Sequence, residues 1–244
     1  MERVVVAGAT GGIGRAIVER LLTHPDREVW GLCRQPDQER DWCERMAGRL
    51  HLIRWDAREP EQIAGQLRAS LPDRTMLDGL IYAAGRLHGE GLQPEKRLED
   101  LDADSMAQAF AINATAFPLL VRSLLPWFRH PGLKRFMAVS AKVGSIDDNR
   151  MGGWYAYRAS KAALNMFTRN LSIELPRRLR SVACVAVHPG TTRTALSAPF
   201  EQSLAQLRVH TPDDTAGNLL TIFDALTSDD NGRFINWDGR DLPW

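Results

Sequence analysis

Tyr157 and Lys161 stand four residues apart in a helix-prone run, and this pair is the most chemically informative feature of the chain. Side chains four residues apart share one helix face, so the Lys161 ammonium is expected below the Tyr157 phenol. A free phenol has a pKa of about 10, and a fixed cation nearby favours the phenolate and lowers that pKa. The pair is therefore predicted to exchange a proton in alcohol and carbonyl chemistry. Tyr155 competes for this role, but the residue four positions after it is the uncharged Ala159.

A glycine-rich turn near the N-terminus supports this interpretation, since a Tyr-x-x-x-Lys spacing alone also occurs by chance. The apolar run 4–7 is followed by Gly8, Gly12 and Gly14, and then by a helical pattern over 15–22. Glycines let the backbone approach a pyrophosphate, and a helix N-terminus presents amides and a partial positive charge to it. The order of strand, turn and helix predicts a dinucleotide site.

Alternating elements are expected to position these residues. Strand-like runs are expected at 3–7, 28–32, 50–54, 80–83, 135–140, 182–187 and 234–237, and helices at 60–69, 104–129, 154–175 and 212–226. Strands separated by helices predict a doubly wound α/β fold with a mostly parallel sheet covered on both faces. No linker divides the chain, so residues 1–244 are expected to form one domain, with irregular loops at about 86–101 and 191–209 that are expected to border the substrate.

Helix-capping residues agree with this element order. Asp104 is expected to cap the helix that carries Asn113, and Pro60 is expected near a helix start. Thr211, followed by Pro212, is expected to cap the last long helix.

Composition excludes several classes of partner. A net charge of +1 gives no reason to expect nucleic acid or an anionic membrane surface. Cys33, Cys43 and Cys184 are odd in number and widely spaced, which predicts reduced thiols in a cytoplasmic protein and no metal site. No stretch is expected to supply the roughly 20 apolar residues that cross a bilayer.

Taken together, these motifs resemble the short-chain dehydrogenase/reductase family over nearly the whole chain. The family's mid-helix Asn matches Asn113, its Pro-Gly segment matches Pro189 and Gly190, and Thr194 follows; the glycine turn and the Tyr-x-x-x-Lys pair match as well. Residues 143–161 and 231–244 resemble the C-factor and carbonyl-reductase-like branch. The resemblance implies a seven-stranded Rossmann-type domain that transfers a hydride between a nicotinamide and a carbonyl or secondary alcohol.

The resemblance also implies roles for individual residues. Tyr157 would donate or accept the hydroxyl proton, Lys161 would lower its pKa and hold the nicotinamide ribose, and Asn113 would support a proton-relaying water. The chain departs from the family at Ala141, where a serine normally polarises the substrate oxygen. Losing one such donor slows the reaction by about 10²-fold to 10³-fold.

Two nearby serines are candidates for the missing hydroxyl. Ser140 lies one position before Ala141, and Ser145 lies in the following loop. Alternation along a strand turns Ser140 to the opposite face unless the strand has ended there. Packing or capping is the alternative role for each serine.

Arg34 indicates which nicotinamide cofactor is used. An acidic residue after the second strand would bind the ribose 2′-hydroxyl of NAD, whereas a basic residue would bind the 2′-phosphate of NADP. Arg34 follows that strand, and no carboxylate comes before Asp37. A guanidinium grips phosphate with two parallel hydrogen bonds, and Arg15 is expected to reach the same phosphate. NADP(H) is therefore the expected cofactor, with a solvent-facing role as the alternative for either arginine.

The remaining cofactor contacts follow from the family pattern. Asp56 matches an adenine-contacting acid, with a helix cap before Pro60 as its alternative, and Thr191 and Thr192 rival Thr194. At 82–85 the chain has Tyr-Ala-Ala-Gly where many relatives have Asn-Asn-Ala-Gly, so the asparagine hydrogen bonds are missing. The full expected set is Gly8, Thr10, Gly12, Ile13, Gly14, Arg15, Arg34, Asp56, Ala84, Gly85, Tyr157, Lys161, Pro189, Gly190 and Thr194.

The preferred hypothesis is an NADPH-dependent carbonyl reductase for a small or medium-sized, largely apolar carbonyl compound. The alternative is a cofactor-binding regulatory or signalling protein with weak or no catalysis, which Ala141 keeps open. The resemblance implies a homo-oligomer, a dimer or tetramer, formed through the two long helices. The apolar residues available for this are Phe110, Phe117, Leu120, Leu124, Leu164 and Phe167, with packing inside the chain as the alternative.

Overall fold

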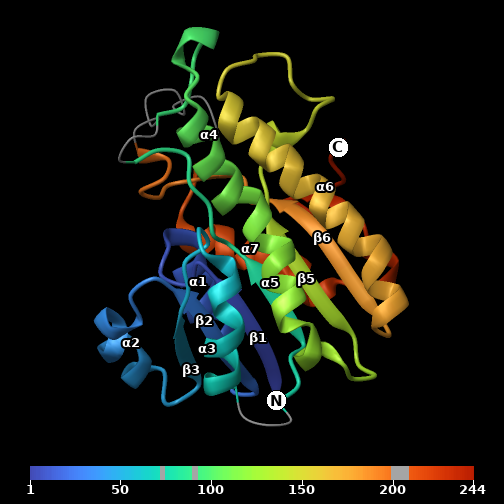
Figure 1. Cartoon of the computed structure of the whole chain (residues 1–244). Coiled ribbons are helices and arrows are strands. Elements are labelled where there is room, and N and C mark those ends of the chain that lie inside the picture. Colours follow the sequence, from blue (N-terminus) through green and yellow to red (C-terminus); the bar gives the residue numbers. More distant parts are fainter. Residues whose placement is uncertain (72–74, 90–92, 199–208) are drawn as a thin grey trace.

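A seven-stranded sheet of parallel strands forms the centre of the molecule (Figure 1). The computed structural model describes residues 1–71, 75–89, 93–198 and 209–244. The strand order is β3-β2-β1-β4-β5-β6-β9, so the winding reverses between β1 and β4 and the expected doubly wound fold is confirmed. The strands are β1 Glu2–Ala7, β2 Arg27–Cys33, β3 Leu50–Arg54, β4 Gly79–Tyr82, β5 Lys134–Val139, β6 Val182–His188 and β9 Phe234–Asn236.

Helices cover both faces of this sheet. They are α1 Gly12–Leu21, α2 Arg40–Arg45, α3 Ile63–Ser70, α4 Ala103–Phe110, α5 Ala116–Leu124, α6 Tyr155–Arg178 and α7 Pro212–Ala225. Successive strand residues point to opposite faces, which divides the buried core in two. In β1, Val4 and Val6 pack in the core with α1 and α7, whereas Val5 and Ala7 pack in the core with α3, α5 and α6.

The predicted strands agree with the observed ones to within one residue at each end. The predicted cap of α4 is wrong: the Asp102 carboxylate accepts from the Ser105 amide, and Asp104 lies in the first turn. The predicted cap of α7 is confirmed, because Thr211 and Asp214 form a reciprocal capping box. The short helix α2 and the two-residue strands β7 Thr191–Thr192 and β8 Val209–His210, which pair with each other, were not predicted.

The long middle helix is interrupted where the sequence predicted a continuous one. A π-helical turn, Ala111–Thr115, separates α4 from α5. The Tyr82 phenol, buried at the end of β4, donates to the Ile112 carbonyl in this turn. A π turn frees backbone groups from the regular helical pattern, and such turns occur frequently at functional sites.

The same middle helix is more apolar than the sequence analysis predicted. The span Ala103–Phe128 is long and apolar enough to cross a membrane by length and composition alone, although 50% of its most apolar window is buried inside the protein. Phe117, Leu120 and Leu124 of α5 belong to the sheet-facing core. Core packing accounts for this apolar character, and Leu164 of α6 packs in the same core.

Candidate active site

Tyr157 and Lys161 lie in the first two turns of α6, on one face of the helix as predicted. The Lys161 Nζ atom is 5.8 Å from the centroid of the Tyr157 ring. Lys161 is buried, and its ammonium donates to the Val139 carbonyl at the end of β5 over 2.9 Å. The tip of β5 therefore fixes the cation beside the phenol.

Burial decides the charge state of this pair. The Tyr157 ring is only half-buried, yet desolvation of the phenolate raises the pKa of Tyr157 to about 12. Desolvation of the ammonium lowers the pKa of Lys161 to about 8. Desolvation raises the phenol pKa here, and the lowering of this pKa by Lys161 stays a prediction. At neutral pH the phenol keeps its proton and is a proton donor.

Asn113 sits in the π turn and joins three elements. Its Oδ1 atom accepts from the Arg86 amide over 2.7 Å, and its Nδ2 atom donates to the Arg86 carbonyl over 2.9 Å and to Ser160 Oγ over 3.0 Å. The Ser160 hydroxyl donates in turn to the Tyr157 carbonyl over 2.9 Å. A Cβ atom built on Gly85 would lie 3.6 Å from both Asn113 Oδ1 and Lys161 Nζ. The structure thus brings Asn113, Tyr157, Lys161 and Gly85 together.

Neither candidate serine has a hydroxyl proton to spare for a substrate. Ser140 Oγ donates to Asn165 Oδ1 over 2.6 Å, and the residue is buried against α6. Ser145 Oγ donates to the Trp244 carbonyl over 3.1 Å and accepts from the Asp148 amide. Ser140, predicted among the catalytic residues, therefore has a packing role in this structure, because its proton is committed to a buried amide oxygen.

The glycine turn is built by close contacts that exclude larger residues. Gly8 has φ +83°, and a Cβ atom there would lie 2.8 Å from the Ala84 amide nitrogen. A Cβ atom on Gly14 would lie 2.1 Å from the Gly8 carbonyl oxygen. On Gly12 it would meet the Thr194 methyl group at 2.8 Å. The turn therefore lies against the end of β4 and the segment after β6, with the N-terminus of α1 directly behind it.

Residues 2–205 match the family model described as short chain dehydrogenase. The chain belongs to this family. Two of the three similar proteins described next, C-signal and a carbonyl reductase, support the carbonyl-reductase-like branch. C-signal from Myxococcus xanthus is 38% identical over 148 residues, covering 60% of this chain and 83% of that protein. The 1-hydroxy-2-glutathionyl-2-methyl-3-butene dehydrogenase of Rhodococcus sp. strain AD45 is 29% identical over 245 residues, covering 100% of both. The NADPH-bound carbonyl reductase from chicken fatty liver has a TM-score of 0.86 and 26% identity, covering 100% of this chain and 94% of that chain.

Other expected dinucleotide contacts of this short-chain dehydrogenase surround the same turn. Thr10 is exposed at the turn, Ile13 is half-buried, and Pro189 is buried directly before Gly190, whose φ is +77°. The Thr191 and Thr192 pair of strand β7 binds strand β8, which closes the base of the 191–209 loop. Residues 199–208 of this predicted substrate loop lie outside the described part of the chain.

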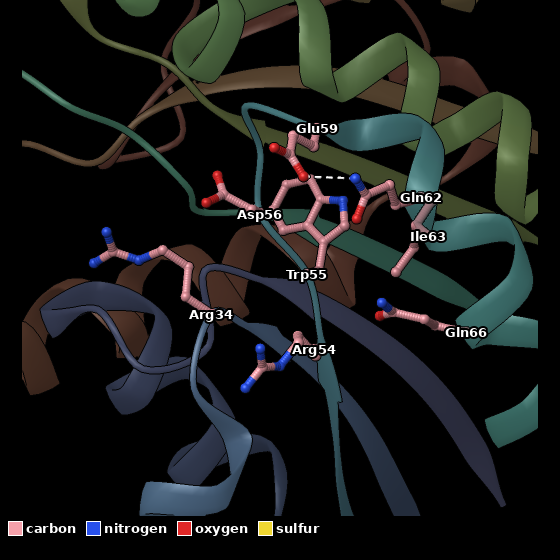
Figure 2. A pocket seen from close by; sticks show the side chains of 8 residues that line it. All are labelled: Arg34, Arg54, Trp55, Asp56, Glu59, Gln62, Ile63 and Gln66. Carbon is pink, nitrogen blue, oxygen red and sulfur yellow. Dashed lines mark hydrogen bonds between the residues drawn. The ribbon is translucent and has the colours of Figure 1, made fainter.

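A pocket of about 200 Å³ lies between the ends of β2 and β3 and the beginning of α3 (Figure 2). Figure 2 shows Arg34 on one side of Trp55, with Gln62 and Gln66 on the other side. The Trp55 Nε1 and Gln66 Oε1 atoms are buried without a hydrogen-bond partner. Within the described ranges, no carboxylate forms an ion pair with Arg34. The lining also holds Arg54, Asp56 and Glu59. Two arginines and two unsatisfied polar atoms around one pocket fit the adenosine end of a phosphorylated dinucleotide, with Arg34 as the arginine that has no close carboxylate partner.

Arg15, which is expected to contact the 2′-phosphate, already has protein partners. The Arg15 guanidinium pairs with Glu39 at 3.1 Å and with Glu19 at 3.3 Å, and it stacks over the Trp42 ring. These two carboxylates balance its charge, so Arg34 is the better candidate for the 2′-phosphate.

The carboxylate expected to contact the adenine is also occupied. Both oxygens of Asp56 accept from the Arg58 guanidinium, and this pairing holds the pKa of Asp56 below its usual value. Asp56 Oδ1 also accepts from the Arg58 amide over 2.9 Å, which supports the turn before α3. Adenine binding by Asp56 stays a prediction that requires this exposed pair to open.

The two predicted substrate loops meet beside the glycine turn. A ring nitrogen of His88, Nε2, lies 3.0 Å from the Ala195 carbonyl, which links the loop after β4 to the loop after β7. In the loop after β4 the structure identifies a residue that the sequence analysis missed. Glu95 is buried beside the first turn of α6, and nothing in its sequence context distinguishes it from a solvated loop acid.

Gly14→Ala is expected to destabilise the fold by about 1–3 kcal/mol, because the new methyl group would overlap the Gly8 carbonyl and force the backbone apart. It is also expected to weaken NADPH binding, since the glycine turn would move. Thermal unfolding and a fluorescence titration with NADPH measure the two effects. Gly65→Ala is the matched control: Gly65 lies in α3 with no atom near its Cβ position, so alanine there is expected to be neutral or stabilising. Equal behaviour of the two variants would contradict the prediction.

Proposed function

We propose that the protein is an NADPH-dependent carbonyl reductase that acts on a small or medium-sized carbonyl compound. One observation carries the proposal: a phenol that burial keeps protonated stands on α6 with Lys161, at the edge of the sheet that also holds the glycine turn. Two similar proteins support it. The chicken protein is a carbonyl reductase with bound NADPH, and the Rhodococcus relative is a dehydrogenase.

Three residues of the chain have separate roles in the proposed reduction. NADPH, when bound, supplies the hydride to the carbonyl carbon. Tyr157 then gives its phenol proton to the oxygen, on which negative charge develops. The Lys161 ammonium, held by the Val139 carbonyl, stabilises the phenolate that remains. Asn113 fixes the loop after β4 against α6 through Arg86 and Ser160, which keeps these groups in register.

A second candidate function rests on the segment directly after strand β5. Ala141 has no hydroxyl, and the Ser140 and Ser145 hydroxyls are committed to other acceptors. A protein of this kind could bind NADPH and change its partners without efficient turnover. The relative from Myxococcus xanthus has the name C-signal, which agrees with a signalling role.

Consumption of NADPH with a panel of ketones and aldehydes tests the two candidates. Reduction of one or more compounds that Tyr157→Phe abolishes supports the reductase. Tight NADPH binding with no turnover of any compound would support the regulator and contradict the reductase. A preference for NADH over NADPH in the same assay would contradict the proposed cofactor.

The rate of reduction is expected to fall above about pH 8. The pKa of Lys161 is lowered to about 8, so its ammonium is present below this pH and is lost above it, whereas the Tyr157 phenol keeps its proton until about pH 12. The profile of kcat/KM against pH reports groups of the free enzyme, so its alkaline limb should belong to Lys161. Lys161→Met should be slow at every pH and should lack this limb. A wild-type limb at pH 10 or above, where an ordinary lysine titrates, would contradict the assignment.

A further inference from the structure

Asn165 lies one helical turn after Lys161, on the same face of α6. Its side-chain amide is buried and forms hydrogen bonds outside the helix. The Oδ1 atom accepts from Ser140 Oγ over 2.6 Å, and the Nδ2 atom donates to the Gly144 carbonyl over 3.4 Å. Asn165 thus connects the middle of α6 to the segment that directly follows β5.

Both parts of that segment lie against Lys161. Ser140 directly follows Val139, whose carbonyl accepts from Lys161 Nζ over 2.9 Å. A Cβ atom on Gly144 would lie 2.7 Å from Lys161 Cβ, so this glycine packs directly on the lysine. An ammonium has three donors, and among the residues that the structure describes it is Val139 that supplies an acceptor. The position of the Val139 carbonyl therefore determines where the ammonium lies.

Packing alone does not require polar side chains at these two positions. Ser140 is 2% exposed and Asn165 is 3% exposed. Burial of a hydroxyl and an amide has a desolvation penalty, which the hydrogen bond between them offsets. Replacement of both partners by apolar groups of the same shape is nearly neutral for stability. The polar pair differs from such an apolar pair in having a directional bond, which fixes the end of β5 relative to α6.

We propose that Ser140 and Asn165 are positioning residues that hold the Val139 carbonyl at hydrogen-bonding distance from the Lys161 ammonium. This inference rests on the proposed reductase function, and it gives a role to a serine whose proton is not available to the substrate. Without the bond between the two side chains, the end of β5 shifts against α6 and the carbonyl moves away from the ammonium. A carbonyl acceptor favours the charged form, so its loss lowers the pKa of Lys161 further below its ordinary value.

The ionisable groups on the elements around Lys161 leave this control to the carbonyl. On α6 itself, the Tyr157 phenol keeps its proton until about pH 12. The π turn and the segment after β4 contribute Asn113 and Gly85, which carry no charge. The charged side chains of the adjacent segments have other partners: Lys142 pairs with Asp148 at 3.2 Å, Arg86 donates to Gln108 Oε1, and Arg158 donates to the Val143 and Gly153 carbonyls.

The double variant Ser140→Ala/Asn165→Leu tests the proposal, because it replaces both partners by apolar groups of similar shape. Its thermal unfolding is expected to stay close to that of the wild type. The chain contains four lysines, so an NMR titration with isotope-labelled lysine resolves Lys161, whose signal is identified by its loss in Lys161→Met. The pKa of Lys161 is expected to be about one pH unit lower in the double variant. Ser140→Ala alone should shift it in the same direction, and an unchanged or higher value in both variants would overturn the proposal.

Two controls accompany this titration. Lys134 begins β5 at the opposite end of the strand, where its ammonium donates to the His130 carbonyl over 2.6 Å, so it should titrate identically in all variants. Ser172→Ala removes another buried hydroxyl of α6, one that donates to a carbonyl of its own helix over 2.7 Å. It should leave the pKa of Lys161 unchanged. An equal shift in Ser172→Ala would indicate general loosening of α6 and would overturn the proposal.

The dependence of reduction on pH provides a second readout. The double variant is expected to be about fivefold slower than the wild type at pH 8 and nearly equal at pH 6, because a lysine of lower pKa loses its proton at the higher pH alone. A loss of the same size at both pH values would indicate general damage to the site and contradict the proposal. The titration needs no substrate, so the two failures are distinguishable. If the wild type binds NADPH but reduces no carbonyl compound, the proposed function fails and the titration decides this inference; if the wild type is active and Lys161 titrates alike in both proteins, only this inference fails.

Discussion

Replacing Tyr157 by phenylalanine is expected to lower kcat for carbonyl reduction by about 10²-fold to 10⁴-fold, the contribution of a well-placed general acid. The pKa of the phenol is raised to about 12, so the group is a protonated donor throughout the physiological range. Phenylalanine removes that proton and keeps the ring, which packs edge-on against Trp154 with centroids 6.2 Å apart. Affinity for NADPH is therefore expected to change little. Single-turnover measurements with saturating NADPH isolate the chemical step.

Tyr155→Phe is the matched control for this prediction. Tyr155 lies two positions earlier on the same helix, so the substitution removes an identical hydroxyl from the same turn of α6. It is expected to leave kcat within about twofold of the wild-type value, as is usual for a substitution outside the site. A large loss in Tyr155→Phe with little effect of Tyr157→Phe would identify Tyr155 as the proton donor and would contradict the proposed mechanism.

The sequence was sufficient for features that depend on local periodicity. Apolar runs such as 182–187 are buried on both faces of a parallel sheet, so they stand out from the polar connections around them. The glycine turn was predictable for a similar reason, since Gly14 tolerates no side chain against Gly8. The helical spacing of Tyr157 and Lys161 also predicted their shared face correctly.

Partners distant in the sequence were not predictable in this way. Whether Ser140 is free depends on Asn165, which comes 25 residues later, and the charge of Arg15 is balanced by Glu39 in a short helix that has no periodic pattern. The Tyr157 pKa was predicted from one neighbouring cation, whereas the whole surrounding protein determines its desolvation. Glu95 likewise lies buried against the Ala156 amide, 61 residues later in the chain, which nothing in its local sequence indicates.

Substitution of Arg34 is the best test of cofactor choice, because both the local sequence and the contacts seen in the structure favour this residue. Its place after β2 was predicted from local sequence, and the structure adds that it lines a pocket and that, among the described residues, no carboxylate lies within ion-pair distance of it, although Asp56 in the same lining attracts it electrostatically. A charged hydrogen bond contributes about 1.5–3 kcal/mol, or roughly tenfold to a hundredfold in affinity, and an aspartate would add repulsion of the 2′-phosphate. The unphosphorylated dinucleotide lacks this group, so its binding should be affected much less.

Arg34→Asp is therefore expected to raise the dissociation constant for NADPH by roughly a hundredfold while that for NADH stays equal or falls. Fluorescence titration with each dinucleotide measures this directly and does not depend on knowing the substrate. Arg54→Asp provides the matched control, because Arg54 lines the same pocket but lies 3.8 Å from Asp37, a carboxylate that already screens its charge. A smaller effect on NADPH is expected there. Equal or tighter binding of NADPH by Arg34→Asp would contradict the assignment of the 2′-phosphate to Arg34, and a larger effect of Arg54→Asp would transfer it to the end of β3.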